Sequence, residues 1–263
     1  MKFFHHLLIA LFLFSSNFFA QSDNEDYTLE EIIVTAQKTE KSLQDVPIAV
    51  SALSADDLAL RQAVRFTDLQ LNVPNLSYSE TNFGGSSVSI RGIGRLATGI
   101  SFDQSVTTHI NESPWGENTN VATMFDMDRV EVLRGPQGTL FGRGTTAGLV
   151  NLVTKRPSVD SGVEGYAGFT TGEYDLQVFE GAVNIPLDDN FAVRAAYTQT
   201  ERDGFTENLY APVGGTFDGR EHYVGRISLR YDSGNTVIDY MYQEHEEEST
   251  RTLRTNYVCT PSA

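Results

Sequence analysis

A glycine-rich connection between two β-prone segments constrains the fold of this chain more than any other feature. Residues 130–133 form a β-branched run, and a second apolar run covers residues 149–154. Pro136 and a cluster of glycines lie between them, and glycines allow tight turns and close approach of the backbone. The pattern predicts a compact strand–loop–strand unit. The glycines are Gly135, Gly138, Gly142, Gly144 and Gly148.

Two short helices are predicted upstream of this unit. Ser54, followed three residues later by an aspartate, forms a capping-box pattern at the start of a helix over 54–61. A second helix over 67–71 ends before Pro74, because the residue that precedes a proline disfavours helical backbone. With the strands expected around them, the order of elements predicts a small α+β domain over residues 45–157. These strands are expected at 45–53, 88–94 and 126–133.

The first twenty residues have the layout of a secretory signal peptide. Lys2 precedes an apolar run over Phe3–Leu13, and polar and small residues continue to Ala20. An N-terminal membrane anchor is the alternative, but the run is too short to span a bilayer comfortably and polar sequence follows at once. We therefore expect residues 1–20 to be removed on export and residues 21–44 to form a flexible leader.

The acidic composition argues against nucleic acid as a partner. The 263 residues carry a formal net charge of −16, whereas nucleic acid favours basic surfaces. Acidity fits a solvated surface or loops that meet cationic or metal-bearing ligands, and charge that serves solubility alone is an equally good interpretation. The single cysteine, Cys259, is expected to pair with a partner beyond residue 263, in a longer protein of which this chain is the N-terminal part.

Amphipathic strands are predicted in the last part of the chain, residues 158–263. Aromatic and aliphatic side chains alternate there with arginine and other polar side chains. One face then suits lipid and the other an aqueous lumen, as in a transmembrane β-barrel, and about five strands are too few to close one. A soluble β-sandwich is the alternative, since it also alternates. The clearest strands are expected at 191–198, 223–232 and 238–243. Short turns are expected at 186–190 and 232–235, and a long loop at 202–222. Phe191 and Tyr231 border the short turns, as residues of an aromatic girdle would.

Residues 130–154, together with the segment 89–94, strongly resemble the plug domain of TonB-dependent outer-membrane receptors. These proteins import scarce nutrients, most often iron chelates, through a plugged β-barrel. The resemblance implies an α+β plug domain followed by an antiparallel transmembrane β-barrel, in the cell outer membrane. The residues that carry the plug motif are Arg91, Gly92, Arg134, Gly135, Gly138, Gly142 and Arg143.

Three arginines of the motif have two possible roles. Arg91, Arg134 and Arg143 are candidates for salt bridges from plug to barrel wall, because the guanidinium group holds a carboxylate bidentately. Capping of turns within the plug is the equal alternative.

Between the two matched segments the chain departs from the family. Residues 109–115 replace a tyrosine–valine–aspartate–glycine turn. In the family, plug loops at this position face the external ligand. The departure therefore has two interpretations, which are substrate specificity and drift in an exposed loop.

Residues 30–38 resemble the TonB box, which binds the periplasmic energy-transducing protein TonB. A β-prone run lies there in an acidic flank, and an unpaired strand on a flexible leader suits β-augmentation of a partner's sheet edge. An ordinary first strand of the plug is the alternative. The short distance from the cleavage site leaves no room for the N-terminal signalling domain of some members, so transport without a transcriptional signalling arm is expected. The expected TonB-binding residues are Ile32, Ile33, Val34, Thr35 and Ala36.

The function that the resemblance implies is energised uptake of a ferric siderophore or another iron chelate. A carbohydrate or vitamin transporter, and a plug-like binding module without transport, are the alternatives. The expected partners are TonB, the small nutrient and outer-membrane lipid.

Catalytic chemistry has little support in the sequence, and we expect no catalytic site, cofactor or resident metal. Residues 142–147 match the dinucleotide fingerprint G-x-G-x-x-A but lead into a predicted strand, whereas that motif must open a helix. Residues 244–248 combine glutamates with His245, but on a strand such side chains alternate between faces. A solvated loop base is expected there.

Overall fold

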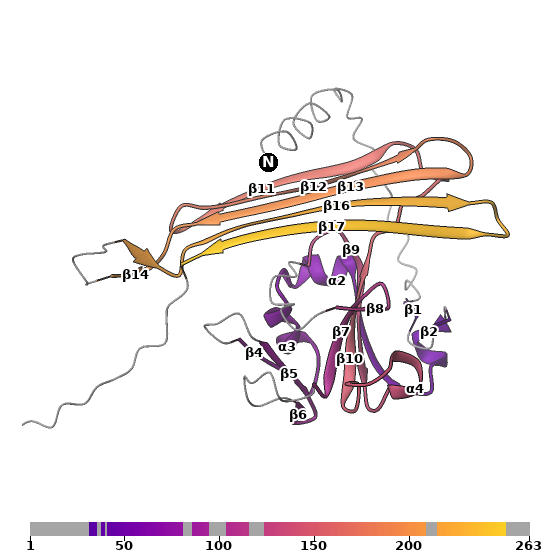
Figure 1. Cartoon of the computed structure of the whole chain (residues 1–263), viewed down its shortest axis with the longest axis horizontal. Coiled ribbons are helices and arrows are strands. Elements are labelled where there is room, and N and C mark those ends of the chain that lie inside the picture. The colour runs from indigo at the N-terminus through magenta and orange to yellow at the C-terminus, as the bar shows by residue number, and fades with distance from the viewer. Residues whose placement is uncertain are drawn as a thin grey trace, which may run out of the picture. The chain divides into compact units, whose positions relative to one another are not determined.

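The computed structural model describes the chain over residues 32–35, 38–39, 41–80, 86–94, 104–115, 124–208 and 215–250. The predicted signal peptide, most of the leader, Ala36 and Cys259 lie outside these residues. The described chain forms an α+β domain that ends at Thr154 and an antiparallel sheet that begins at Glu164 (Figure 1).

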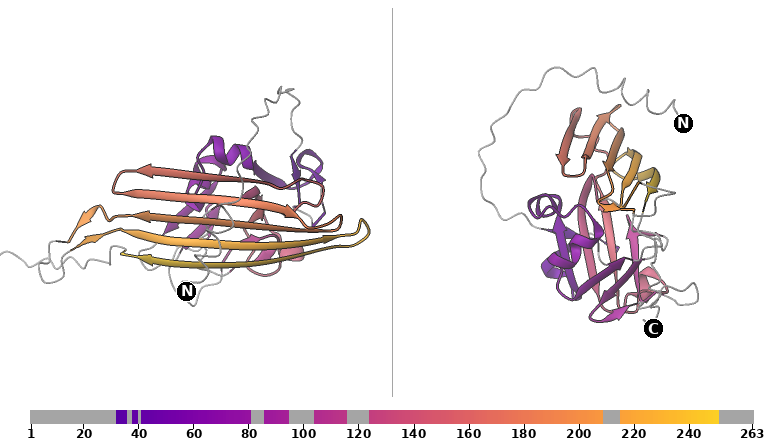
Figure 2. Two further views of the ribbon diagram at one scale, coloured as in Figure 1. Left: turned by 90° about the horizontal axis from the view of Figure 1, so that it is seen from above. Right: turned by 90° about the vertical axis from the view of Figure 1, so that its left-hand side faces the viewer.

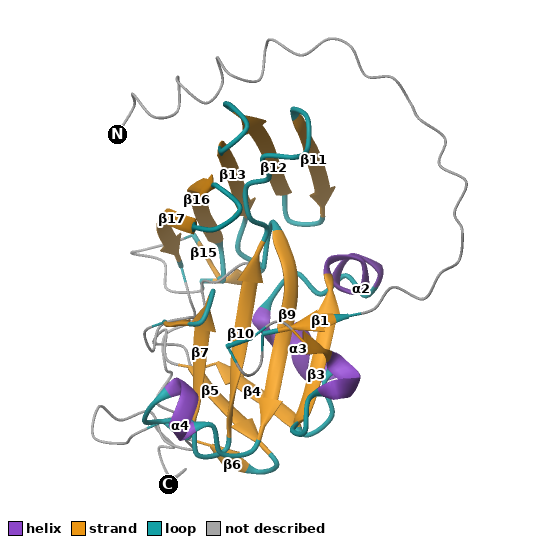
Figure 3. Ribbon diagram, turned by 90° about the vertical axis from the view of Figure 1, so that its right-hand side faces the viewer, coloured by secondary structure: helices purple, strands orange, loops and turns teal. Residues whose placement is uncertain are grey.

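A five-stranded mixed sheet, here called the N-terminal sheet, is the centre of the first domain (Figure 3). Its strand order is β3-β9-β10-β7-β8, and within it only β7 and β10 pair in parallel. The predicted strand–loop–strand unit is the antiparallel pair β9 and β10. The strands are β3 (Ala49–Ser54), β7 (Val106–Ile110), β8 (Ser113–Pro114), β9 (Met127–Arg134) and β10 (Gly148–Thr154).

Each face of the N-terminal sheet carries its own apolar cluster, because side chains alternate along a strand. Val132 and Val150 lie on one face, in a cluster with Phe66 and Leu69. Leu133 and Leu149 lie in the second cluster, with Val34 and Val46. The second face is therefore covered by residues that precede the sheet in the sequence.

The predicted capping box is confirmed at the start of α2 (Ala55–Leu60). The Asp57 backbone N–H donates to Ser54 Oγ at 3.2 Å, and the Ser54 N–H donates to an Asp57 carboxylate oxygen at 3.3 Å. Helix α3 (Leu69–Asn72) follows the 3-10 turn η2 (Phe66–Asp68) and ends before Pro74, as predicted. No helix in the described ranges is both long and apolar enough to cross a membrane.

The glycine-rich connection contains a helical turn that the sequence did not predict, α4 (Gly138–Phe141). Gly135 and Gly142 have positive φ on either side of it, whereas Gly138 does not. Three further short elements complete the domain. A three-stranded sheet contains β4 (Leu76–Glu80), β5 (Ser86–Ile90) and β6 (Ile93–Gly94), and a hairpin contains β1 (Ile33–Val34) and β2 (Lys41–Ser42), followed by η1 (Leu43–Asp45).

The second sheet, here called the C-terminal sheet, is an antiparallel meander in the order β11-β12-β13-β16-β17 (Figure 2). The expected five strands are thus present. The expected long loop contains a small two-stranded extension, β14 with β15. The strands are β11 (Glu164–Gly172), β12 (Leu176–Pro186), β13 (Phe191–Arg202), β14 (Thr206–Glu207), β15 (Thr216–Phe217), β16 (Arg220–Asp232) and β17 (Val237–Ser249).

The two faces of the C-terminal sheet are inverted relative to a soluble sheet. Arg194 and Arg226 are 4% and 3% exposed, whereas Tyr240 on the opposite face is 60% exposed. A β-sandwich would bury its apolar face, whereas the apolar face of this sheet is exposed among the described residues. The face predicted to line a wet lumen is instead buried in this region. Phe191 and Tyr231 lie beside the two short turns with ring centroids 4.8 Å apart, and their role as girdle residues stays a prediction.

A substitution at Gly148 tests how closely β10 approaches Leu133 of β9 and Ile90 of β5. Its φ is +149°, and an added Cβ would lie 2.2 Å from Leu133 O and 2.8 Å from Ile90 Cδ1. We expect Gly148→Ala to lower the free energy of unfolding by about 1–3 kcal/mol. Urea unfolding, followed by Trp115 fluorescence, measures this change.

Gly138→Ala is the matched control, because a Cβ at Gly138 has no atom within 4 Å and its φ is not positive. That variant should change the free energy of unfolding by less than about 0.5 kcal/mol. Equal unfolding midpoints for the two variants would contradict the close approach at Gly148.

Candidate functional site

The segment Ile32–Thr35, here called the coupling segment, lies along the N-terminal domain as part of a hairpin. Ile33 pairs with Ser42, and the Leu43 N–H donates to Ile32 O at 2.9 Å. Val34 is fully buried in the cluster with Leu133. The expectation of an unpaired strand is therefore wrong for this conformation, because Val34 gains apolar cover and the backbone gains a partner.

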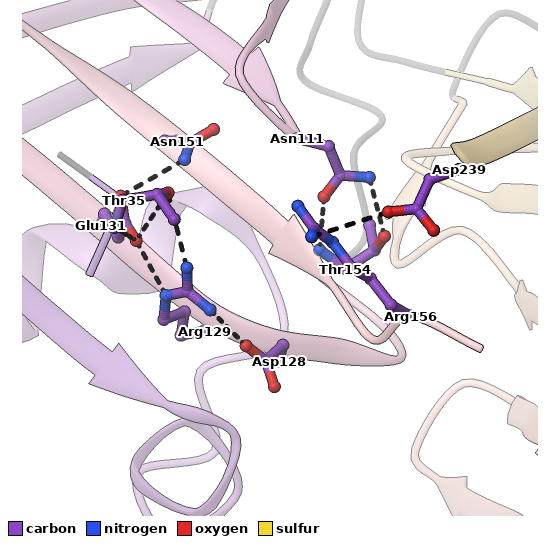
Figure 4. Close-up of polar contacts among 9 residues, drawn as sticks. All are labelled: Thr35, Asn111, Asp128, Arg129, Glu131, Asn151, Thr154, Arg156 and Asp239. Carbon is purple, nitrogen blue, oxygen red and sulfur yellow. Dashed lines mark hydrogen bonds and ion pairs between the residues drawn. The ribbon is translucent and has the colours of Figure 1, made fainter. Parts of the chain in front are cut away.

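The carboxylate of Glu131 holds the far end of the coupling segment (Figure 4). The Thr35 N–H donates to Glu131 Oε1 at 2.8 Å, and the Thr35 hydroxyl lies 3.2 Å from the same oxygen. Glu131 is fully buried in the middle of β9. A buried carboxylate requires paired charge and hydrogen bonds, and here the coupling segment supplies two of its donors.

Arg129 supplies the opposite charge. Its Nε donates to Glu131 Oε1 at 2.8 Å, and its Nη2 lies 3.4 Å from the Thr35 hydroxyl. Arg129 also contacts Asp128, which is exposed. The cluster of Thr35, Arg129 and Glu131 is therefore a charge-assisted junction between β9 and the coupling segment.

Asn151 extends this junction across the sheet. Glu131, Asn151 and His109 are register partners on β9, β10 and β7, so their side chains share one face. Asn151 Nδ2 donates to Glu131 Oε2 at 3.3 Å, and its Oδ1 accepts from the Glu112 N–H at 3.0 Å. The row links the coupling segment to the turn between β7 and β8.

His109 closes the row. Its Nδ1 lies 3.1 Å from Glu112 O and its Nε2 lies 3.1 Å from Thr107 Oγ1, so a neutral ring can donate at Nδ1 and accept at Nε2. The ring packs edge-on against Phe141 of α4 at 5.4 Å between centroids. Burial lowers the pKa of His109 below its usual 6.5, which favours that neutral form.

A buried ion pair joins the domain to the C-terminal sheet. Asp126, next to β9, takes a bidentate contact from Arg194 of β13, in which Arg194 Nε donates to Oδ2 at 2.9 Å and Nη2 donates to Oδ1. Arg226 of β16 lies over the Phe125 ring at 4.6 Å and points one nitrogen at Asp126 O, 3.4 Å away. Two arginines of the sheet are thus anchored by two consecutive residues of the domain.

A second link lies beside the chain that connects the two parts. Asp239 of β17 accepts from Arg230 at 2.7 and 2.9 Å and lies 3.6 Å from Arg156 (Figure 4). The Asn111 side chain exchanges hydrogen bonds with Thr154, at 2.9 and 3.0 Å. The two ion pairs of Asp239 are more exposed than the Asp126 pair, so each is worth less to stability.

The three motif arginines are dispersed. Arg91 has a left-handed backbone at φ +54°, beside Gly92 at +76°, and Arg143 is exposed. Arg134 ends β9, and its Nε is buried without a hydrogen-bond partner among the residues described. No salt bridge of these three is present within that part of the chain, so their two possible roles stay predictions.

The signals set aside in the sequence have a plain structural account. Residues 142–147 run into β10, as expected. Residues 244–248 lie within β17, so the expected loop base is wrong, while the alternation of their side chains holds. Over the described ranges, no group of three or more histidine, cysteine or carboxylate side chains is placed to hold a metal ion.

Sequence reasoning missed Asp126, Arg129, Glu131 and Arg194 as site residues. One signal was present, because Glu131 is the charged residue within the otherwise apolar run 130–133. A second was the placement of Arg194 on the face opposite the aromatic side chains.

Comparison with known proteins identifies this architecture. The family described as TonB-dependent Receptor Plug Domain matches residues 42–149. The chain is 30% identical to an iron-regulated outer membrane virulence protein of Vibrio cholerae over 202 residues, 73% of this chain and 30% of the relative. It is 25% identical to the vitamin B12 transporter BtuB of Vibrio vulnificus over 242 residues, 84% of this chain and 39% of that protein.

A solved structure shows the same fold. The ferric yersiniabactin uptake receptor FyuA from Yersinia pestis matches with a TM-score of 0.65 at 23% identity, over 75% of this chain and 31% of FyuA. The expected fold, a plug domain followed by the first strands of an antiparallel barrel, is confirmed. The chain spans about a third of the length of the curated relatives it matches. The expected domain bounds stay predictions.

Removal of the Asp126 carboxylate tests the buried pair. Asp126→Asn leaves the Arg194 charge buried without a counter-charge, and we expect a loss of about 3–5 kcal/mol in the free energy of unfolding. Urea unfolding of the detergent-solubilised protein measures it. Arg230→Gln, which breaks the more exposed pair with Asp239, should cost about 0–1 kcal/mol. Equal costs for the two variants would contradict the anchoring role of Asp126.

The lowered pKa of His109 predicts a pH dependence of stability. The unfolded histidine takes up a proton near pH 6.5, whereas the folded one resists protonation until lower pH. Its contribution to the free energy of unfolding is therefore fully present above pH 6.5 and is lost as the pH falls below that value. His109→Gln should remove this component, measured as the difference between the two proteins from pH 7.5 to about pH 5. Parallel curves would refute it.

Proposed function

Since the chain belongs to the TonB-dependent receptors through its plug domain at residues 42–149, we propose that it is part of an outer-membrane transporter for energised nutrient uptake. The observation that carries the proposal is a plug domain pinned by Asp126 to a sheet that buries arginines and exposes aromatic side chains. Such a sheet suits lipid on its exposed face.

The coupling segment supplies the proposed link to energy. TonB pairs with Ile32–Ala36 by β-augmentation and pulls, powered by the inner-membrane proton gradient. Among the described residues the docked hairpin has two register pairs, so these backbone contacts are few enough to exchange for a partner strand. The plug then rearranges and opens a path. The protein performs no covalent chemistry on its substrate and is not an enzyme.

The proposed substrate is a ferric siderophore or another iron chelate. The names of the Vibrio cholerae and Yersinia pestis relatives support it, because both refer to iron. The relative named a vitamin B12 transporter favours a cobalamin as the second candidate. Uptake of radiolabelled ferric chelates and of labelled cobalamin by iron-starved cells separates the two.

Arg134 is proposed to pair with a carboxylate of the barrel wall. Its buried, unpartnered Nε supports pairing with the wall over capping of a turn, since a buried donor without a partner is costly. Arg91 and Arg143 keep the same proposed role on the resemblance alone.

Ile33→Pro tests the proposed coupling. Proline removes a backbone donor and so prevents ladder pairing with TonB. We expect uptake of the transported chelate to be abolished while its binding to cells is retained. Ile33→Ala, which keeps the N–H and shortens a half-exposed side chain, is the matched control and should transport. Uptake by the proline variant would show that energy does not enter through this segment.

A further inference from the structure

Asn151 is the only described side chain that contacts both Glu131 and the backbone of Glu112 through hydrogen bonds. Its Nδ2 donates to Glu131 Oε2 at 3.3 Å and its Oδ1 accepts from the Glu112 N–H at 3.0 Å. Asn151 is 1% exposed. Because the two ends of one rigid amide make these contacts, a rotation that breaks one contact displaces the other.

The turn between β7 and β8, which Asn151 contacts through the Glu112 N–H, has a strained backbone. Asn111 and Glu112 have φ of +48° and +66°, and a left-handed glutamate is unfavourable because of its Cβ. Thr154 holds the Asn111 side chain, and His109 and Asn151 hold the Glu112 backbone. Strained backbone persists where its surroundings over-determine it, so loss of one of these contacts favours movement of the turn.

On its other side, Asn151 contacts Glu131, the carboxylate that holds the coupling segment. Glu131 uses Oε1 for the Thr35 N–H and for Arg129, and Oε2 for Asn151 at 3.3 Å and for the Thr35 hydroxyl at 3.4 Å. A fully buried carboxylate that loses a donor becomes less well compensated. Oε2 then keeps only the long contact with the Thr35 hydroxyl among the described residues, so the contacts of the carboxylate, including those to Thr35, rearrange.

We propose that Asn151 is a positioning residue that couples the turn at Asn111–Glu112 to the grip of Glu131 on the coupling segment. Displacement of the turn withdraws Asn151 from Glu131 and loosens Thr35. The inference rests on the proposed function for its biological meaning, since release of this segment is what a partner strand would require. The coupling itself is a property of the plug and can be measured without transport.

Amide hydrogen exchange of residues 33–35 in the full-length, detergent-solubilised protein measures the grip. Glu112→Pro removes the N–H and cannot adopt the positive φ, so it displaces the turn. We expect exchange of the Thr35 amide to accelerate at least about tenfold, as a loss of 1.4 kcal/mol would give. Asn151→Ala alone should accelerate it similarly, and the proline should then add less than about twofold in the Asn151→Ala background.

Two controls define the result. Asp128→Asn removes the other negative charge beside Arg129 without touching Asn151 and should leave Thr35 exchange unchanged. The Val132 and Val150 amides must stay protected, which shows an intact sheet. Where Glu112→Pro exposes them, Asn111→Ala replaces it in the same cycle. This variant removes the side-chain hydrogen bonds to Thr154 and the contact with Met241 Sδ.

Two outcomes would overturn the inference. One is unchanged Thr35 exchange when the turn is displaced. The other is an acceleration of equal size with and without Asn151, which would place the coupling elsewhere. Uptake that survives Ile33→Pro would refute the proposed coupling to TonB through this segment and leave this exchange result standing, so the two failures are distinguishable.

Discussion

The bidentate contact between Asp126 and Arg194 is the interaction on which the arrangement of the two sheets depends. The C-terminal sheet turns arginines toward its buried face, and a buried guanidinium group is tolerable only with a paired charge and satisfied hydrogen bonds. The domain supplies both through two consecutive residues, Phe125 and Asp126, immediately before β9. The same strand carries Glu131 further along, so one strand contacts the sheet wall at one end and the coupling segment at its centre.

Most of the correct predictions from the sequence came from periodic patterns and from local motifs. The helix at α2 follows from Ser54 and its capping box, and strands β13, β16 and β17 follow from alternation within 191–198, 223–232 and 238–243. The inversion of that sheet was visible as arginine on one face and tyrosine on the other. These features depend on neighbours within a few positions, so the sequence displays them directly.

The junctions could not be predicted in the same way. Thr35 and Glu131 are 96 positions apart, and Asp126 and Arg194 are 68 apart, so no spacing in the sequence links them. The β1–β2 hairpin was missed because Lys41 and Ser42 have weak strand propensity, and their pairing depends on apolar cover for Val34. Local propensity marked the coupling segment as a strand and left its partner undetermined.

The orientation of the hairpin has a mechanical consequence. Ile32 lies at the open end of β1, opposite Leu43, and Thr35 lies at the closed end beside Glu131. Tension applied at Ile32 loads the backbone hydrogen bonds of the hairpin one after another, starting at the open end. In shear, by contrast, all of these bonds would carry the load at once. Each bond contributes only about 0.5–1.5 kcal/mol net. The first steps of extraction therefore require little peak force, and the ionic junction at Glu131 is the last contact to yield.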